Sequence, residues 1–104
     1  IEPIEISNLK YNGTAKQIGG YVEFDTDGNN HPFTFDAANV AANGGAKVQL
    51  STNPNSLVNP TDLLTVADGA NTIPARTYTV GTSIWLVPTT GSATKLVDFI
   101  QNGD

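Results

Sequence analysis

The chain has 104 residues, of which 38% are hydrophobic and 14% are charged, and its net charge is −5. Nucleic-acid binding is disfavoured, because the five basic residues are scattered singly and form no stripe that could neutralise several phosphates. The acidic, sparsely charged composition also argues against binding to anionic membranes, and no apolar run approaches the roughly 20 residues of a membrane span. Without cysteine, the chain can form neither disulfides nor cysteine-ligated zinc sites.

The distribution of apolar residues predicts an all-β fold. Thr, Asn, Ser and Gly supply most of the polar residues, which is typical of strands joined by turns. About seven or eight short alternating segments indicate an antiparallel β-sandwich or small barrel, Ig-like or jelly-roll-like. We expect one such domain over residues 1–104, with at most one short helical turn near residues 36–43.

The N-terminal segment predicts an edge strand. Ile4 and Ile6 alternate with polar residues, and Pro3 marks the start of the strand because proline cannot donate a ladder hydrogen bond. An apolar edge strand of this kind can complete the sheet of a neighbouring chain. We therefore consider Ile4 and Ile6 as residues of an assembly arm.

Residues 21–36 contain two alternating apolar runs on either side of an Asp-Gly turn, which predicts a β-hairpin. Phe24 would then pair with Phe33 across the turn. Val22 would pair with Phe35 on the same face, so that all four side chains point into a core. A slip of one residue would expose the aromatic rings to water, which favours this register.

The middle of the chain is less regular. Residues 36–45 predict either one or two helical turns, N-capped by Asp36 and ended by an Asn-Gly pair, or a loop. Residues 46–51 predict a strand, and residues 63–66 predict either a short buried strand or the start of a helical turn capped by Thr61. The connection between these two segments is rich in turns, because it holds two Asn-Pro pairs.

Residues 76–87 predict a second hairpin. Gly81 begins a two-residue loop, which suits a type II′ turn. This register places Tyr78 opposite Trp85 on an aromatic face. A last strand follows over residues 94–100.

The first turn also has the spacing of a calcium-binding loop. Oxygen- and nitrogen-bearing side chains occupy positions 1, 3, 5, 7 and 12 of such a loop, namely Asp25, Asp27, Asn29, His31 and Asp36. An EF-hand is nevertheless disfavoured, because position 6 is not glycine and a strand pattern follows where a helix should begin. Two hypotheses remain: a looser calcium site formed by Asp25, Asp27 and Asn29, or a solvated turn without an ion.

Catalytic activity is not expected. The single histidine, His31, lies beside a proline in a turn, where burial and pKa tuning are hard to arrange. Aromatic residues offer the better ligand site, because Trp85, Tyr78 and Tyr21 could stack on a sugar ring if they were exposed. The alternative, which we favour, is that Trp85 and Tyr78 belong to the core.

Two functions fit these features. The first is a non-enzymatic structural subunit of an extracellular assembly, such as a virion decoration protein or a surface filament, located on a virion or cell surface. Its partners would be copies of itself or another structural protein, because low charge and poorly defended strand edges favour self-association. The second is a carbohydrate-binding or adhesive module of a larger secreted protein, which would use the aromatic residues, with or without calcium at the Asp-Gly turn.

Overall fold

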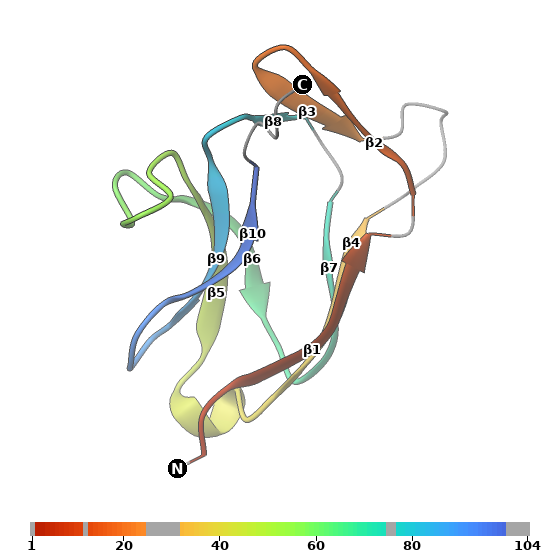
Figure 1. Cartoon of the computed structure of the whole chain (residues 1–104). Helices are drawn as coiled ribbons and strands as arrows, with labels where there is room; N and C mark the ends of the chain where they lie inside the picture. Colours follow the sequence, from red (N-terminus) through yellow and green to blue (C-terminus); the bar gives the residue numbers. More distant parts are fainter. Residues whose placement is uncertain (1, 12, 25–31, 75–76, 100–104) are drawn as a thin grey trace.

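The computed structural model describes residues 2–11, 13–24, 32–74 and 77–99, and it confirms the all-β prediction with a small β-sandwich (Figure 1). The elements in chain order are β1 (Glu5–Tyr11), β2 (Ala15–Ile18), β3 (Tyr21–Phe24), β4 (Phe33–Ala38), the 3₁₀ turn η1 (Ala41–Asn43), β5 (Ala46–Ser51), β6 (Thr61–Val66), β7 (Gly69–Ile73), β8 (Tyr78–Thr79), β9 (Ser83–Pro88) and β10 (Thr94–Asp98). Within the described ranges, no helix is long and apolar enough to cross a membrane.

Three antiparallel sheets make up the fold. The β4 sheet has the order β1-β4-β7, the β5 sheet has the order β10-β9-β5-β6, and the end sheet has the order β2-β3-β8. The first two sheets form the layers of the sandwich, and the end sheet lies across one end of them (Figure 1). Because the end sheet adds short strands, the strand number exceeds the seven or eight that the sequence predicts.

The core lies between the β4 and β5 sheets. Alternate residues of β4, Phe33 and Phe35, are 6% and 2% exposed, while Val48 of β5 and Ile84 of β9 are fully buried. Since successive strand residues point to opposite faces, one set of alternating apolar positions per strand is enough to fill the space between two sheets. The buried residues of these strands are therefore the alternating apolar residues by which the sequence predicts strands.

The predicted hairpin over residues 21–36 is wrong in its pairing. β3 pairs with β2 and β8 in the end sheet, whereas β4 pairs with β1 and β7. Alternation correctly predicts that Phe33 and Phe35 share a buried face, but it does not determine which strand lies alongside. The hairpin that β3 does form is with β2, and its loop is the Gly19–Gly20 pair, because Ile18 lies opposite Tyr21.

The second predicted hairpin is also wrong. β8 pairs with β3, whereas β9 lies between β5 and β10. The Thr82 N–H donates to the Thr79 carbonyl at 3.2 Å, so Gly81 is the third residue of the turn, where its φ of 97° suits type II. A type II turn does not match the twist of a hairpin and splays the strands on either side of it. This agrees with the path of the chain, which passes at this turn from β8 in the end sheet to β9 in the β5 sheet.

The short helical turn is present but begins later than predicted. β4 continues through Asp36 to Ala38, and η1 is capped by Asp68 from the β6–β7 connection. The Asp68 carboxylate accepts hydrogen bonds from the Val40 and Ala41 N–H groups at 2.8 and 3.2 Å. Gly44 ends the turn with a φ of 84°, as the Asn-Gly pair predicts.

Replacing Phe35 tests the position of the core. We expect Phe35→Ala to lower the free energy of unfolding by about 3–5 kcal/mol, because it removes a buried aromatic ring between the two sheets. Denaturant unfolding measures this change, and Thr65→Ala on an exposed position of β6 serves as the control. A loss below about 1 kcal/mol for Phe35→Ala would contradict this core, since such losses are usual for surface substitutions.

Candidate functional site

The two layers are joined on one side by the short β6–β7 connection, and we call this the closed side, although the outer edges of β6 and β7 are themselves unpaired in the described residues. On the closed side, the buried Asn71 side chain ties the β6–β7 connection, accepting from the Ala67 N–H at 3.0 Å and donating to the Ala67 carbonyl at 2.8 Å. On the other side, among the described residues, β1 pairs only with β4 and β10 pairs only with β9. The outer edges of β1 and β10 are therefore unpaired, and we call the space between them the open side.

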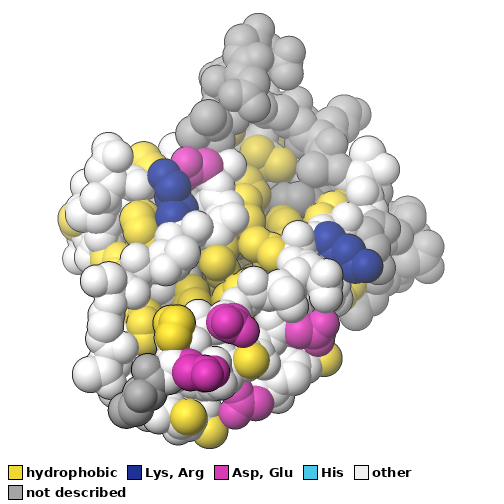
Figure 2. All heavy atoms as spheres, turned by 60° about the horizontal axis from the view of Figure 1, so that its bottom comes forward, with side chains coloured by type: hydrophobic (Ala, Val, Ile, Leu, Met, Phe, Trp, Pro, Cys, Tyr) yellow, Lys and Arg dark blue, Asp and Glu magenta, His cyan; other side chains and the backbone are white. Residues whose placement is uncertain are grey.

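The open side is lined by apolar side chains from both layers. Ile4, Ile6 and Leu9 on the β1 side, and Leu96 and Val97 on the β10 side, pack against the core but remain partly exposed. Figure 2 shows hydrophobic side chains gathered in a hollow between two walls of more polar surface. Apolar surface that the fold leaves accessible in this way marks a contact site more often than a scattered exposed residue does.

A hollow of about 220 Å³ lies at one end of the open side. Pro3 and Ile4 line it from the N-terminal segment, and Leu86, Pro88 and Thr94 line it from β9 and β10. The N-terminal segment is held in place here, because Asn43 Nδ2 donates to the Glu2 carbonyl at 2.6 Å. The hollow is thus bounded by ordered backbone from both layers.

Each edge of the open side carries a β-bulge. The register of β1 shifts between Ser7 and Lys10, and the register of β10 shifts between Lys95 and Val97. Bulges limit the length over which a further strand can pair with an edge. A partner at the open side would therefore rely on apolar contacts and only a short backbone ladder.

The outer face of the β5 sheet carries a row of polar residues around Trp85. Lys95, Trp85 and Gln49 are cross-strand neighbours, and the Lys95 ammonium lies 6.0 Å from the centre of the indole ring. The row continues to Asp62, which accepts from Gln49 Nε2 at 2.6 Å and from Lys47 Nζ at 2.8 Å. The Trp85 indole N–H is enclosed without a hydrogen-bond partner among the described residues.

Hydrogen bonds on this face lower the pKa of two carboxyl groups. Donation from Lys47 and then from Gln49 lowers the pKa of Asp62, and donation from Ser83 and then from Lys95 lowers that of Asp98. Lys95 also forms an ion pair with Asp98 at 2.9 Å. The polar groups of this face thus largely bind one another.

The three aromatic residues considered for sugar binding do not form one surface. Tyr78 is 1% exposed and stacks on Phe99 with ring centres 4.6 Å apart, so its ring is part of the core. Trp85 points outward from the β5 sheet and is partly exposed, whereas Tyr21 is 39% exposed on the end sheet. Tyr78 and Trp85 are not paired, because they lie in different sheets.

The remaining predicted site residues are placed as follows. The candidate calcium ligands Asp25, Asp27 and Asn29, together with His31, lie outside the described residues. In the described part of the chain, no group of three or more acidic or histidine side chains could hold a metal ion. Ile6 pairs with Ala37 of its own chain, so a role of the N-terminal residues as an arm on a neighbour stays a prediction.

Comparison with protein-family models, with curated proteins and with solved structures found no match.

Sequence reasoning missed the open side. The signal that could have indicated it is the spacing in β1, where the inward-facing residues after Ile6 are Leu9 and Tyr11, so that one step is three residues instead of two. Such a step is typical of a β-bulge, and bulges are common at sheet edges.

Acid titration tests the Asp98 contacts. The folded-state pKa of Asp98 lies below the ordinary value of 3.8, so its contribution to stability is present above that pH and is lost as the pH falls through the lowered pKa. We expect Asp98→Asn to flatten the dependence of the unfolding temperature on pH below about 4. An unchanged pH profile in thermal unfolding would contradict these contacts.

Proposed function

We propose that this protein is a non-enzymatic structural subunit that associates with copies of itself through the open side of the sandwich. The observation that carries the proposal is the apolar space between β1 and β10, which is bordered by two unpaired strand edges. We propose that a second copy of the chain covers the open side. In a two-fold symmetric contact, the apolar patch of one copy covers the same patch of the other.

The chemistry of the open side supports this proposal. Its lining is formed mainly by partly exposed aliphatic side chains, and Thr94 at its mouth is uncharged and exposed. Interface cores are depleted in charged residues and rich in apolar area, as this lining is. The short regular stretch of β1 before its bulge could add backbone hydrogen bonds to the apolar contact.

The setting of the subunit is part of the same proposal. Small β-sandwich domains, including those with Ig-like strand arrangements, are frequent in extracellular and cell-surface proteins. A three-stranded sheet facing a four-stranded one supports an Ig-like interpretation here. We therefore propose an extracellular, cell-surface or virion-surface location, with another structural protein as the alternative partner.

Light scattering after size-exclusion chromatography tests the proposal over a range of protein concentrations. We expect a mass above the 10.9 kDa of one chain, rising with concentration. Thr94→Arg should reduce the protein to a monomer, because it places a charge and a long side chain at the mouth of the hollow. Thr65→Arg, a matched substitution at an exposed position of β6, should leave the mass unchanged.

Two results would contradict the proposal. The first is a wild-type protein that stays at 10.9 kDa at every concentration. The second is an assembly that neither Thr94→Arg nor a second variant, Ile4→Arg, weakens. Thermal unfolding of each variant separates loss of contact from loss of fold.

A further inference from the structure

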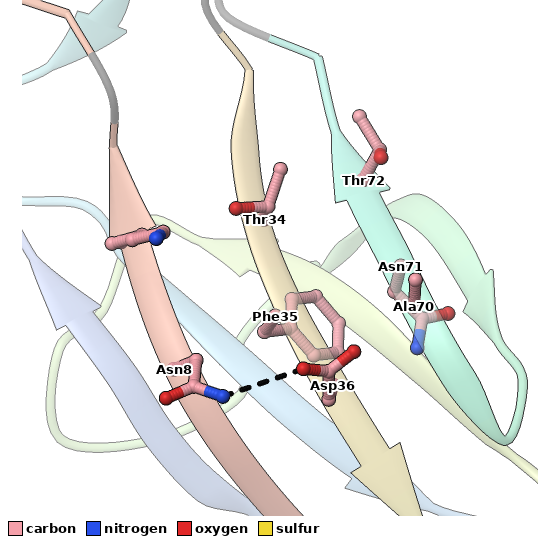
Figure 3. Close-up of a pocket in the computed structure, with 8 residues that line it drawn as sticks. Asn8, Thr34, Phe35, Asp36, Ala70, Asn71 and Thr72 are labelled. Carbon is pink, nitrogen blue, oxygen red and sulfur yellow. Dashed lines mark hydrogen bonds between the residues drawn. The ribbon is translucent and has the colours of Figure 1, made fainter.

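The outer face of the β4 sheet contains a polar hollow that is separate from the open side. The hollow has a volume of about 280 Å³. Its lining includes the ammonium group of Lys10, the carboxylate of Asp36 and the amide of Asn8. The hydroxyl groups of Thr34 and Thr72 and the methyl group of Ala70 also line it. Figure 3 shows Asn8, Thr34, Asp36 and Thr72 along the face made by β1, β4 and β7.

Strand register explains why these side chains meet. Lys10, Thr34 and Thr72 are cross-strand neighbours and form one row on the outer face. Asp36 and Ala70 are cross-strand neighbours in the next row. Ala70 is exposed and has only a methyl side chain. It therefore extends less far from the sheet than the neighbouring side chains, and the space over Ala70 forms part of the hollow.

The β1 bulge adds Asn8 to this face. Ser7 and Asn8 are both exposed, and Asn8 has a φ of 57°, which is uncommon for a residue other than glycine. A bulge can redirect a side chain in this way. Asn8 Nδ2 points at the Asp36 carboxylate with a long hydrogen bond of 3.4 Å, which leaves the second carboxylate oxygen and the amide oxygen open to a ligand.

The charges of this hollow differ from those of the opposite face. On the β5 sheet, Lys47 pairs with Asp62 at 2.8 Å, and Lys95 pairs with Asp98 at 2.9 Å. Among the residues that the structure describes, Lys10 and Asp36 form no ion pair, with each other or with a third group. The hollow therefore presents one positive and one negative group whose charges cancel.

We infer that this hollow binds a neutral, hydroxyl-rich ligand, a single sugar residue of a carbohydrate. One carboxylate is too few for a hard cation, which takes six or more oxygen ligands. One lysine without converging backbone N–H groups is a poor phosphate site. Hydroxyl groups of a sugar both donate and accept, so they match a lining that mixes donors with acceptors.

The size of the hollow supports a single ring. Its volume of about 280 Å³ lies just below the range of about 300–1,000 Å³ that is usual for small-molecule pockets, which suits a ligand no larger than one ring. The methyl groups of Ala70 and the two threonines can contact the C–H face of a ring, while Asp36 and Asn8 bind hydroxyl groups at its rim. This site differs from the aromatic surface that the sequence suggested, because it contains none of Trp85, Tyr78 and Tyr21.

Nuclear magnetic resonance titration of the ¹⁵N-labelled full chain tests the inference. The probes are the methyl glycosides of glucose, galactose, mannose and N-acetylglucosamine at millimolar concentration, and glycine is the zwitterionic comparison. We expect at least one glycoside to shift the amide resonances of Asn8, Asp36 and Ala70. Asp36→Ala should weaken that binding by about tenfold or more, because it removes a charged hydrogen-bond acceptor.

Two further variants make the result specific. Ala70→Leu should also abolish the shifts, since it fills the hollow and leaves every polar group in place. Asp62→Ala, which removes an exposed carboxylate from the β5 sheet, should leave the affinity unchanged. Both variants change exposed positions, and their amide spectra report directly whether the fold is kept.

The inference is overturned if none of the four glycosides shifts resonances of this face. It is equally overturned if Asp36→Ala and Ala70→Leu bind as the wild type does, or if glycine shifts these resonances and the glycosides do not. Shifts centred on Trp85 and removed by Trp85→Ala would place a sugar on the opposite face and would also overturn it.

Discussion

The fold depends on the burial of one face of β4 against the β5 sheet. Phe33 and Phe35 of β4 meet a layer in which Val48 and Ile84 are fully buried, and the third member of the β4 face, Ala37, is 6% exposed. Without disulfides, this apolar contact is the main source of stability. It determines which residues point inward, and thus which side chains the two outer faces present.

The asymmetry between the two sides of the sandwich follows from how the chain crosses between layers. Where β6 passes into β7, Asn71 and Asp68 bind backbone groups and close that side. No comparable connection joins β1 and β10 in the described residues, because these strands come from opposite ends of the sequence. The same core that holds the layers together is therefore partly accessible there, and our proposal for self-association depends on this accessibility.

The two outer faces differ in how their polar groups are used. On the β5 sheet, lysine and carboxylate side chains bind each other around Trp85. On the β4 sheet, Lys10 and Asp36 line a hollow that lies over the small side chain of Ala70. Exposed ion pairs contribute little to stability, so the difference matters more for what each face can bind than for folding.

Sequence periodicity could predict the fold class and the buried faces, as Phe35 and Val48 show, because both depend on local alternation. It could not predict strand partners, because β3 and β4 have similar apolar patterns but lie in different sheets. Contacts between distant residues, such as the cap that Asp68 provides, carry no local signal. The open side and the polar hollow arise from such long-range pairing, together with the bulge at Asn8.

Amide hydrogen exchange in the dilute protein and in the concentrated protein tests the central claim most directly. In dilute solution, we expect the slowest exchange in β4, β5 and β9, which are paired on both sides, and fast exchange at the outer edges of β1 and β10. At high concentration, β1 and β10 should become protected while the outer edges of β6 and β7 do not. Two results would contradict a sandwich that is open on that side and associates through it. One is that β1 and β10 are as strongly protected in the dilute protein as β4, β5 and β9. The other is that the protection of β1 and β10 does not increase at high concentration.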